Sequence, residues 1–485
     1  MKVQYKAEAK FLIAYFHFCL LRAYGPIILV EDEIDVSAGE AVPSKRMPFD
    51  QCVEWISNKF DEAINEGLLV EQATSYYGRA TAVAAKALKG RLLLYAASPL
   101  FNGNREFYEN FVDPETSEPL MNLDYDVNKW KVAQTACQEA VDYAVANGYK
   151  AFWMDENQIP SGHYPKNDTL YSLRMTFQNR ENMEVIWADP RGEDFYGAQN
   201  QSAPRDAVNS GNSWNGVGPS LAVVKNFYTK NGLPISEDPA YYPADKYYNI
   251  GLYEGRTTCN LNLDREPRFY AWIGFHNGWF EMQRTPNAEH NVFDGRLIIK
   301  LRKNDDQGIG NRNADFSLTG YMLKKWVTPG YDTQNGYENY SWPIIRLDEL
   351  YLNLAEAAAE AGDLETAKSA LNVVRKGAGI PSVEKSWEGI ATLDQKKLIE
   401  IIRQERTIEL FAEFQYGWDI RRWKVAEQVL GKQPQGLNIQ GATDEDFFQE
   451  VTVERRWKFS QRNYLLPIDD RELNINQKIV QNPGY

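Results

Sequence analysis

Residues 345–376 carry the pattern that most constrains the fold of this chain, two helical stripes joined by a short turn. Gly362 and Asp363 stand between the stripes, where a glycine can end one helix and an aspartate can cap the next. Small alanines on the facing surfaces let two helix axes approach closely, as in tetratricopeptide units. The segment therefore predicts a helix–turn–helix hairpin. Its apolar positions follow the spacing of one helix face: Leu347, Leu350, Tyr351, Leu354, Ala355 and Ala358, then Leu364, Ala367, Leu371 and Val374.

Comparable stripes occur near the other end of the chain, across 52–64, 84–95 and 130–144. The last two form a second Ala-rich pair, although a loop rich in Phe and Asn separates them. No strict repeat period is visible, so the units are degenerate. We predict a mainly α fold, an α-α superhelix of tetratricopeptide-like helical pairs built from the two ends of the chain. A large, loop-rich, irregular subdomain lies between them in the sequence.

The first 25 residues also show a helical pattern. Their apolar run up to Cys19 superficially resembles a signal peptide that ends in a lipidated cysteine, but charged residues crowd its entry and small residues are missing before the cysteine. No run in the chain is long enough to span a membrane. We expect the chain to begin inside a helical bundle, with its true start missing. The expected core stripe of this first helix consists of Ala9, Leu12, Phe16, Cys19, Leu20 and Ala23.

The central residues differ in character, because long apolar periodicity disappears while Gly, Pro, Asn and aromatic residues increase. Between Tyr241 and Phe280, 11 of 40 positions are aromatic. Long loops of this composition often carry function. We therefore divide the chain into a helical part (1–150), a loop-rich aromatic subdomain with the candidate binding face (151–342), a second helical part (343–430) and an extended C-terminal strap (431–485). We expect the four parts to form one integrated globule.

Composition narrows the classes of function. The formal net charge is -14, and lysine and arginine are not clustered, which argues against a nucleic-acid partner. The four cysteines are widely spaced and three occupy apolar helical positions, so we interpret them as small core residues. The four histidines are scattered, without metal-ligand spacing. Nucleophile-elbow, phosphate-loop and dinucleotide motifs are absent, so the sequence predicts no metal, no cofactor and no catalytic residues.

The densest charged motif lies in 403–422. Thr392 and Gln395 are expected to form a capping box that starts its helix. Glu405, Glu409 and Glu413 recur every four residues, and like charges at that spacing repel unless cations neutralise them. A metal or glycosidase site is one interpretation. We favour a structural network in which nearby arginines brace helix against helix; its predicted members are Arg403, Glu405, Arg406, Glu409, Asp419 and Arg422.

Several sequence blocks in order resemble the SusD/RagB family. The most characteristic are 346–357 (RLDELYLNLAEA), 402–410 (IRQERTIEL) and 419–423 (DIRRW). Other blocks are 7–25, 78–101, 265–269 and the end of the chain from Tyr464 to Tyr485. The chain departs from the family pattern at Phe414 and Tyr416, where Gly and Arg are usual, and in the final turns, where it has Pro467-Ile468-Asp469 and Asn476-Gln477.

The resemblance implies a SusD-like surface lipoprotein that captures glycans without catalysis. It implies a lipid anchor on the outer-membrane exterior, outside this chain, and delivery of oligosaccharides to a TonB-dependent, SusC-like transporter. Two alternatives remain open from the residues themselves. One is a glycoside hydrolase that acts on a polysaccharide, because the many carboxylates allow acidic pairs. The other is a helical scaffold that binds no glycan and buries its loop tryptophans.

Flat aromatic rings in polar loops are the candidate glycan contacts, because a ring covers the C–H face of a sugar at little entropic cost. Trp214 lies in a polar loop, and Trp279 follows a turn. The competing interpretation is that each ring pins its loop to the body of the protein. The full set of predicted glycan-binding residues is Trp214, Trp279, Tyr241, Tyr242, Trp272 and Asn212.

Overall fold

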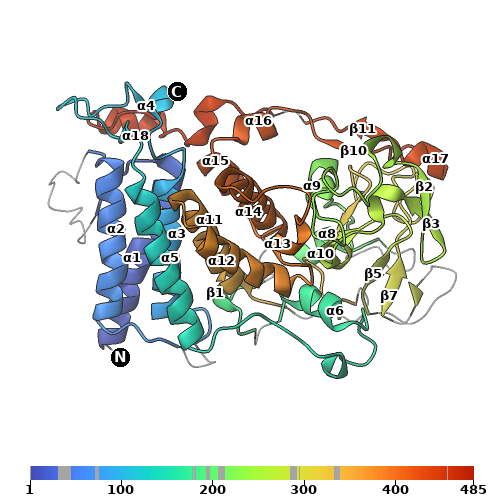
Figure 1. Cartoon of the computed structure of the whole chain (residues 1–485). Coiled ribbons are helices and arrows are strands. Elements are labelled where there is room, and N and C mark those ends of the chain that lie inside the picture. Colours follow the sequence, from blue (N-terminus) through green and yellow to red (C-terminus); the bar gives the residue numbers. More distant parts are fainter. Residues whose placement is uncertain are drawn as a thin grey trace.

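The computed structural model describes residues 2–30, 45–71, 76–176, 178–179, 182–192, 197–205, 213–283, 292–293, 295–332, 339–455 and 457–485. Long helices stand side by side at one end of the molecule, and short strands with long loops form the other end (Figure 1). The long helices are α1 (Lys2–Tyr24), α2 (Phe49–Asn65), α3 (Ala82–Ala97), α5 (Asn128–Ala146), α11 (Leu347–Ala361), α12 (Leu364–Gly377) and α14 (Gln395–Glu409).

The helical stack joins the two ends of the chain. Helix α1 packs on α2, α2 on α3 and α3 on α5, and α5 then packs on α11. Helix α11 also contacts α12 and α14, so it lies at the centre of the stack (Figure 1). Alanines in the contact surfaces, such as Ala133, Ala357 and Ala358, are fully buried and permit the close approach. The predicted mainly α fold is confirmed.

The boundaries of these helices follow local chemistry. The Thr81 side chain accepts a hydrogen bond from Ala84 N at the start of α3, and Asp363 does the same for α12. Gly362 ends α11 in a left-handed conformation with φ of 91°. The predicted capping box of Thr392 is wrong, because the α14 N-cap is Asp394, whose carboxylate accepts from Lys397 N.

Helix α1 exists as predicted, but its predicted core stripe is wrong. Leu12, Phe16 and Leu20 are exposed by 39%, 58% and 45%. The buried stripe is the neighbouring one: Ala7, Phe11, Ala14, Phe18 and Leu21. Because α1 is apolar on both faces, spacing alone could not indicate which face packs on α2.

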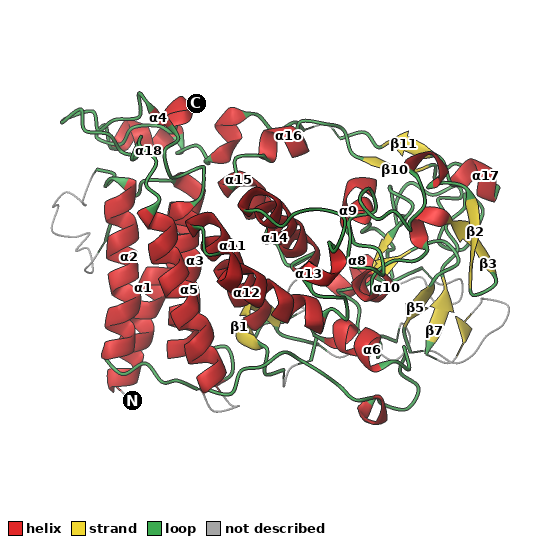
Figure 2. Cartoon of the chain, in the orientation of Figure 1, coloured by secondary structure: helices red, strands yellow, loops and turns green. Residues whose placement is uncertain are grey.

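The strands are short and antiparallel, and most lie at the end of the molecule far from α1 and α2 (Figure 2). Their pairings are β1–β9, β2–β3, β4–β8, β10–β11 and the three-stranded order β5–β7–β6. The strands are β1 (Val185–Asp189), β2 (Ile250–Tyr253), β3 (Arg256–Cys259), β4 (Ile273–Gly274), β5 (Trp279–Glu281), β6 (Val292–Phe293), β7 (Arg296–Ile298), β8 (Met322–Leu323), β9 (Trp342–Arg346), β10 (Gln435–Leu437) and β11 (Glu450–Thr452).

Short helices fill the connections. Among the described residues, no helix combines the length and the apolar character that crossing a membrane requires. The short helices are α4 (Arg105–Tyr108), α6 (Asp168–Met175), α8 (Ala198–Ser202), α9 (Leu221–Asn226), α10 (Pro267–Trp272), α13 (Val383–Ser386), α15 (Tyr416–Arg422), α16 (Ala426–Leu430), α17 (Asp444–Phe447) and α18 (Asp470–Ile475).

The C-terminal residues cross the molecule from the strand-rich end back to the helical stack (Figure 1). Leu466 N donates to Ala23 O at the end of α1. Arg46 is buried and donates to Val480 O and to the Asn482 side chain, at 2.8 and 2.7 Å. These contacts fasten the end of the chain to its beginning.

Candidate functional site

A cavity of about 270 Å³ opens in the strand-rich part of the molecule. Segments 164–170, 253–254 and 270–281 supply most of its wall. Its aromatic lining residues are Tyr164, Tyr253, Tyr270, Phe275 and Trp279. Its charged lining residues are Lys166, Glu254, Glu281, Arg296 and Lys324. Apolar rings with a few convergent polar groups are typical of small-molecule sites.

The β2–β3 hairpin positions one side of the cavity. Tyr253 pairs with Arg256, and only Glu254 and Gly255 connect the two strands. Their φ angles are 48° and 79°, and positive φ at both central residues is typical of the tight hairpin turn whose twist matches its strands. The turn presents Tyr253 and Glu254 to the cavity. The Tyr253 ring stacks on Tyr270, with ring centroids 5.6 Å apart.

Strand β5 positions another part of the cavity wall. Side chains two residues apart share one face of a strand, so Trp279 and Glu281 both line the cavity. Phe280 between them is fully buried in the core. Arg296 of β7 lies opposite Glu281 in the strand register and joins the same wall.

Buried charges form the floor of the cavity. Lys324 Nζ donates to the carbonyls of Tyr270 and Trp279, and it contacts Glu281 Oε2 at 2.8 Å. Arg174, which is fully buried, contacts the same carboxylate at 3.3 Å. Burial lowers the pKa of Lys324 to about 8, although the Glu281 carboxylate opposes this change. The floor is therefore held together by ion pairs and by main-chain carbonyls.

Trp279, one of the predicted glycan contacts, lies in this cavity, but its indole is already engaged. Its Nε1 donates to Glu254 Oε2 at 2.7 Å. The guanidinium groups of Arg256 and Arg296 lie over its rings, at 4.3 and 4.0 Å from the centroid. The indole that the sequence predicted for sugar stacking is therefore already in contact with two cations.

Four further predicted residues lie elsewhere. Trp214 is 44% exposed and is not part of the cavity lining. Tyr242 is half-buried and is also outside the lining. The structure corrects the expectation that Tyr241 and Trp272 contact a glycan. Tyr241 is buried, and its hydroxyl donates to main-chain carbonyls. Trp272 is fully buried against Lys325. Their rings fill the core and cannot face a ligand.

Asn212 lies outside the described residues. Sequence reasoning missed Tyr253, Tyr270, Tyr164 and Arg296 as lining residues. The high aromatic density from Tyr241 to Phe280 contained a signal for two of them. It could not separate the tyrosines that line the cavity from the aromatic residues that fill the core behind it.

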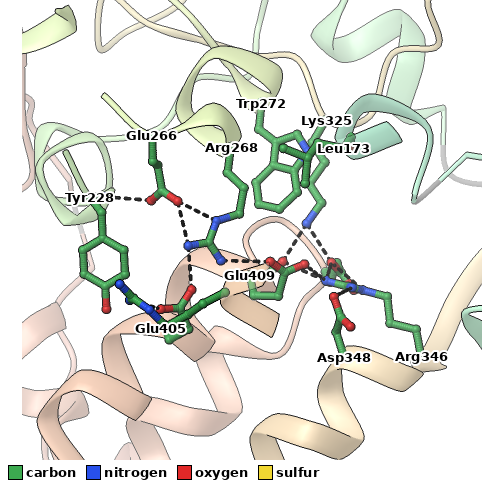
Figure 3. Close-up of polar contacts among 12 residues, drawn as sticks. Leu173, Tyr228, Glu266, Arg268, Trp272, Lys325, Arg346, Asp348, Glu405 and Glu409 are labelled. Atoms are coloured by element: carbon green, nitrogen blue, oxygen red, sulfur yellow. Dashed lines mark hydrogen bonds and ion pairs between the residues drawn. The ribbon is translucent and has the colours of Figure 1, made fainter. Parts of the chain in front are cut away.

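The carboxylates of α14 lie in a buried ionic cluster (Figure 3). Glu405 contacts Arg268 at 2.6 Å and Arg375 at 2.8 Å. Glu409 contacts Arg346 at 2.6 Å and Arg268 at 2.9 Å. Burial alone would raise the pKa of Glu409, but these guanidinium groups lower it to about 2. Glu409 is thus ionised at neutral pH and cannot act as a general acid there.

The cations that neutralise α14 come from distant segments rather than from its own arginines. Glu413, just after the helix, contacts Arg346 of β9 at 2.9 Å and Lys325 at 2.7 Å. Arg268 belongs to α10 and Arg375 to α12. The network therefore joins α14 to the strand-rich part of the molecule as well as to the helical stack.

The helix's own arginines pair with other acids. Arg406 shares the carboxylate of Asp419 with Arg422 of α15, each at 2.8 Å. Arg403 is only partly buried and contacts Glu360 at 3.1 Å. Within the part of the chain that the structure describes, no group of three or more His, Cys, Asp or Glu side chains could hold a metal ion.

The chain is similar in sequence and in structure to proteins of one family. A family model described as the SusD family matches residues 177–485. The SusD-like protein P2 of Formosa agariphila is 34% identical over 170 residues, which span 34% of this chain and only 30% of that relative. The solved structure titled BT4246 has a TM-score of 0.86 and 33% identity, covering 100% of this chain and 84% of its own. A SusD-like protein of Bacteroides fragilis NCTC 9343 has a TM-score of 0.74 and 25% identity, covering 100% and 80%.

Proposed function

Because this chain belongs to the SusD family of glycan-binding proteins, we propose that it captures oligosaccharides in the cavity between β2, β5 and α10 without catalysis. In this proposal, a lipid anchor holds the protein on the exterior of the outer membrane. The bound sugar then passes unchanged to a TonB-dependent transporter. The family resemblance supports the anchoring and delivery steps, and the cavity supports the capture step.

The observation that carries the capture step is the supported aromatic wall. The Tyr253 ring lines the cavity and stacks on Tyr270 at an interplanar angle of 20°. It also packs at a near right angle to Phe275, with ring centroids 5.2 Å apart. A ring held by its neighbours loses little freedom when a sugar covers it. Nearby charged side chains can bind the sugar hydroxyls. Since release to a transporter must be easy, we expect an affinity on the order of micromolar to millimolar.

The two carboxylates of the cavity are poorly placed for hydrolysis, because both are already neutralised. Glu281 is buried between Lys324 and Arg174. Glu254 accepts hydrogen bonds from Arg256 at 3.1 Å and from the indole of Trp279. A glycosidase needs one protonated acid beside one free carboxylate. In this cavity both carboxylates are instead paired with basic side chains.

Calorimetric titration with a panel of oligosaccharides tests the proposal, followed by product analysis of each mixture. We expect binding of intact sugar that weakens about fivefold or more in Tyr253→Ala, because one aromatic contact contributes roughly 1 kcal/mol. Trp214→Ala is the matched control, since it removes an exposed ring outside the cavity. Equal loss in both variants, or loss in the control alone, would contradict the assignment of the site. Shortened sugar products would show hydrolysis. Absence of binding to every sugar in the panel would favour a helical scaffold that binds no glycan.

A further inference from the structure

The cavity is locally cationic although the protein as a whole is strongly acidic. The chain has a formal net charge of -14. Yet Lys166, Arg296 and Lys324 line the cavity against only two carboxylates. An excess of cations in one cavity of an acidic protein creates a local positive electrostatic potential, which attracts anionic ligands to that cavity.

Both carboxylates of the wall are already neutralised. Lys324 and Arg174 contact Glu281 at 2.8 and 3.3 Å. Arg256, which is not itself a lining residue, contacts Glu254 at 3.1 Å. The two wall carboxylates are therefore paired with other cations, and not with Arg296 or Lys166.

Arg296 is presented in a form suited to an anion. Its guanidinium lies over the rings of Tyr164 and Trp279, at 4.6 and 4.0 Å from their centroids. Among the residues that the structure describes, no carboxylate is paired with it. Rings hold the plane of a guanidinium, while its N–H donors remain at the edge. Two parallel N–H donors of a guanidinium match the paired oxygens of a carboxylate or sulfate group.

Lys166 supplies a second cation to the wall of the same cavity. Its side chain is exposed, and its Nζ donates to the main-chain carbonyl of Pro160 at 3.1 Å. In the described part of the chain, no acid is paired with Lys166. An exposed lysine ammonium on its long side chain, in the same wall as the Arg296 guanidinium, can contact an anionic group that enters the cavity.

We propose that the cavity selects an anionic sugar, one that carries a uronate carboxylate or a sulfate ester. Arg296 binds the charged group, Lys166 assists it, and Tyr253 carries the sugar ring. This inference rests on the proposed glycan capture and adds the class of glycan. Carboxylate and sulfate share the chemistry that Arg296 recognises, so the experiment must separate them.

The test compares matched sugars by calorimetry on the full chain. One pair is an oligogalacturonide and its neutral methyl ester, and the other is a sulfated oligosaccharide and its desulfated form. We expect the anionic member of at least one pair to bind about tenfold or more tightly, because one charge-assisted hydrogen bond is worth that ratio. The preference should shrink as salt rises. The pair that shows it distinguishes uronate from sulfate recognition.

Variants at Arg296 test whether this residue causes the preference for the anionic sugar. Arg296→Gln should remove most of the anionic preference, measured as the ratio of anionic to neutral affinity within the same variant. Arg296→Lys should retain part of it, because it keeps the charge and loses the fork. Arg105→Gln is the control, since it removes an exposed arginine outside the cavity lining. Circular dichroism of each variant confirms that it is folded.

The outcomes separate the two proposals. Equal affinity for neutral and anionic members would overturn the anionic selectivity and leave glycan capture intact. Preference that survives Arg296→Gln would overturn the role of Arg296. Absence of binding to every sugar, neutral and anionic, would overturn both proposals together.

Discussion

Replacing Arg346 with methionine should destabilise the protein more than any other single change in the ionic cluster. Its guanidinium is almost fully buried and contacts four carboxylates, with the closest atoms 2.5 to 3.1 Å apart. Methionine retains much of the apolar stem but provides no donor. The four acids that would lose this cation are Glu184, Asp348, Glu409 and Glu413.

The expected magnitude follows from burial. Removing one partner of a buried ion pair costs about 3–5 kcal/mol, because the other charge stays desolvated. Glu413 and Glu409 retain Lys325 and Arg268, so their losses are partial. Since several acids share Arg346, we expect Arg346→Met to cost at least about 4 kcal/mol at neutral pH.

Arg403→Met is the matched control, because it removes a partly exposed arginine that contacts one acid. A pair of that kind contributes about 0–1 kcal/mol. The measurement is urea unfolding followed by circular dichroism, with the free energy taken by linear extrapolation and the slope compared among variants. A loss below about 1 kcal/mol for Arg346→Met, or a loss equal to that of the control, would refute the reasoning.

Two further predictions concern single residues of the helical half. Arg422 lowers the pKa of Glu356 to about 2 from 4.5, against the opposing effect of burial. The ion pair between Glu356 and Arg422 therefore stabilises the fold by ~3 kcal/mol above pH 4.5. This stabilisation is lost as the pH falls towards 2 and Glu356 becomes protonated. The unfolding free energies of the wild type and Glu356→Gln should converge over that range, and a constant difference would contradict this. Phe414 has φ of 61°, a conformation that only glycine adopts without cost. Phe414→Gly should be more stable than Phe414→Ala by about 1 kcal/mol in urea unfolding, and the reverse order would exclude backbone strain as the reason.

The fold was largely predictable because helical periodicity is a local signal. The hairpin of α11 and α12 could be identified from spacing, a glycine and a capping aspartate. The packing face of α1 could not, because Leu12 and Phe11 are adjacent apolar residues on different faces and only the neighbouring helix decides between them. The start of α14 was misplaced by two residues for a related reason, since Thr392 and Asp394 are both good caps.

The site was less predictable because its residues come from segments far apart in the sequence. Trp279 was identified as a candidate from its turn, and it does line the cavity. Its contacts with two guanidinium groups could not be foreseen, since Arg256 and Arg296 reach it from other strands. Tyr241 and Trp272 looked similar to Tyr253 in sequence but are buried, because aromatic density alone does not tell which rings point inwards.

The ionic cluster and the cavity are joined by two short segments, so the proposed binding site should depend on the helical stack. Lys324 lies on the cavity floor, and its neighbour Lys325 contacts Glu413 just after α14. In the same way, α10 sends Arg268 into the cluster and Tyr270 into the cavity. Ion pairs of the cluster thus hold the two backbone segments that also carry the cavity wall. We therefore expect Arg346→Met to weaken glycan binding at temperatures where the variant is still folded, although Arg346 is not a lining residue. Unchanged affinity in the folded variant would show that the cavity is positioned independently of the cluster.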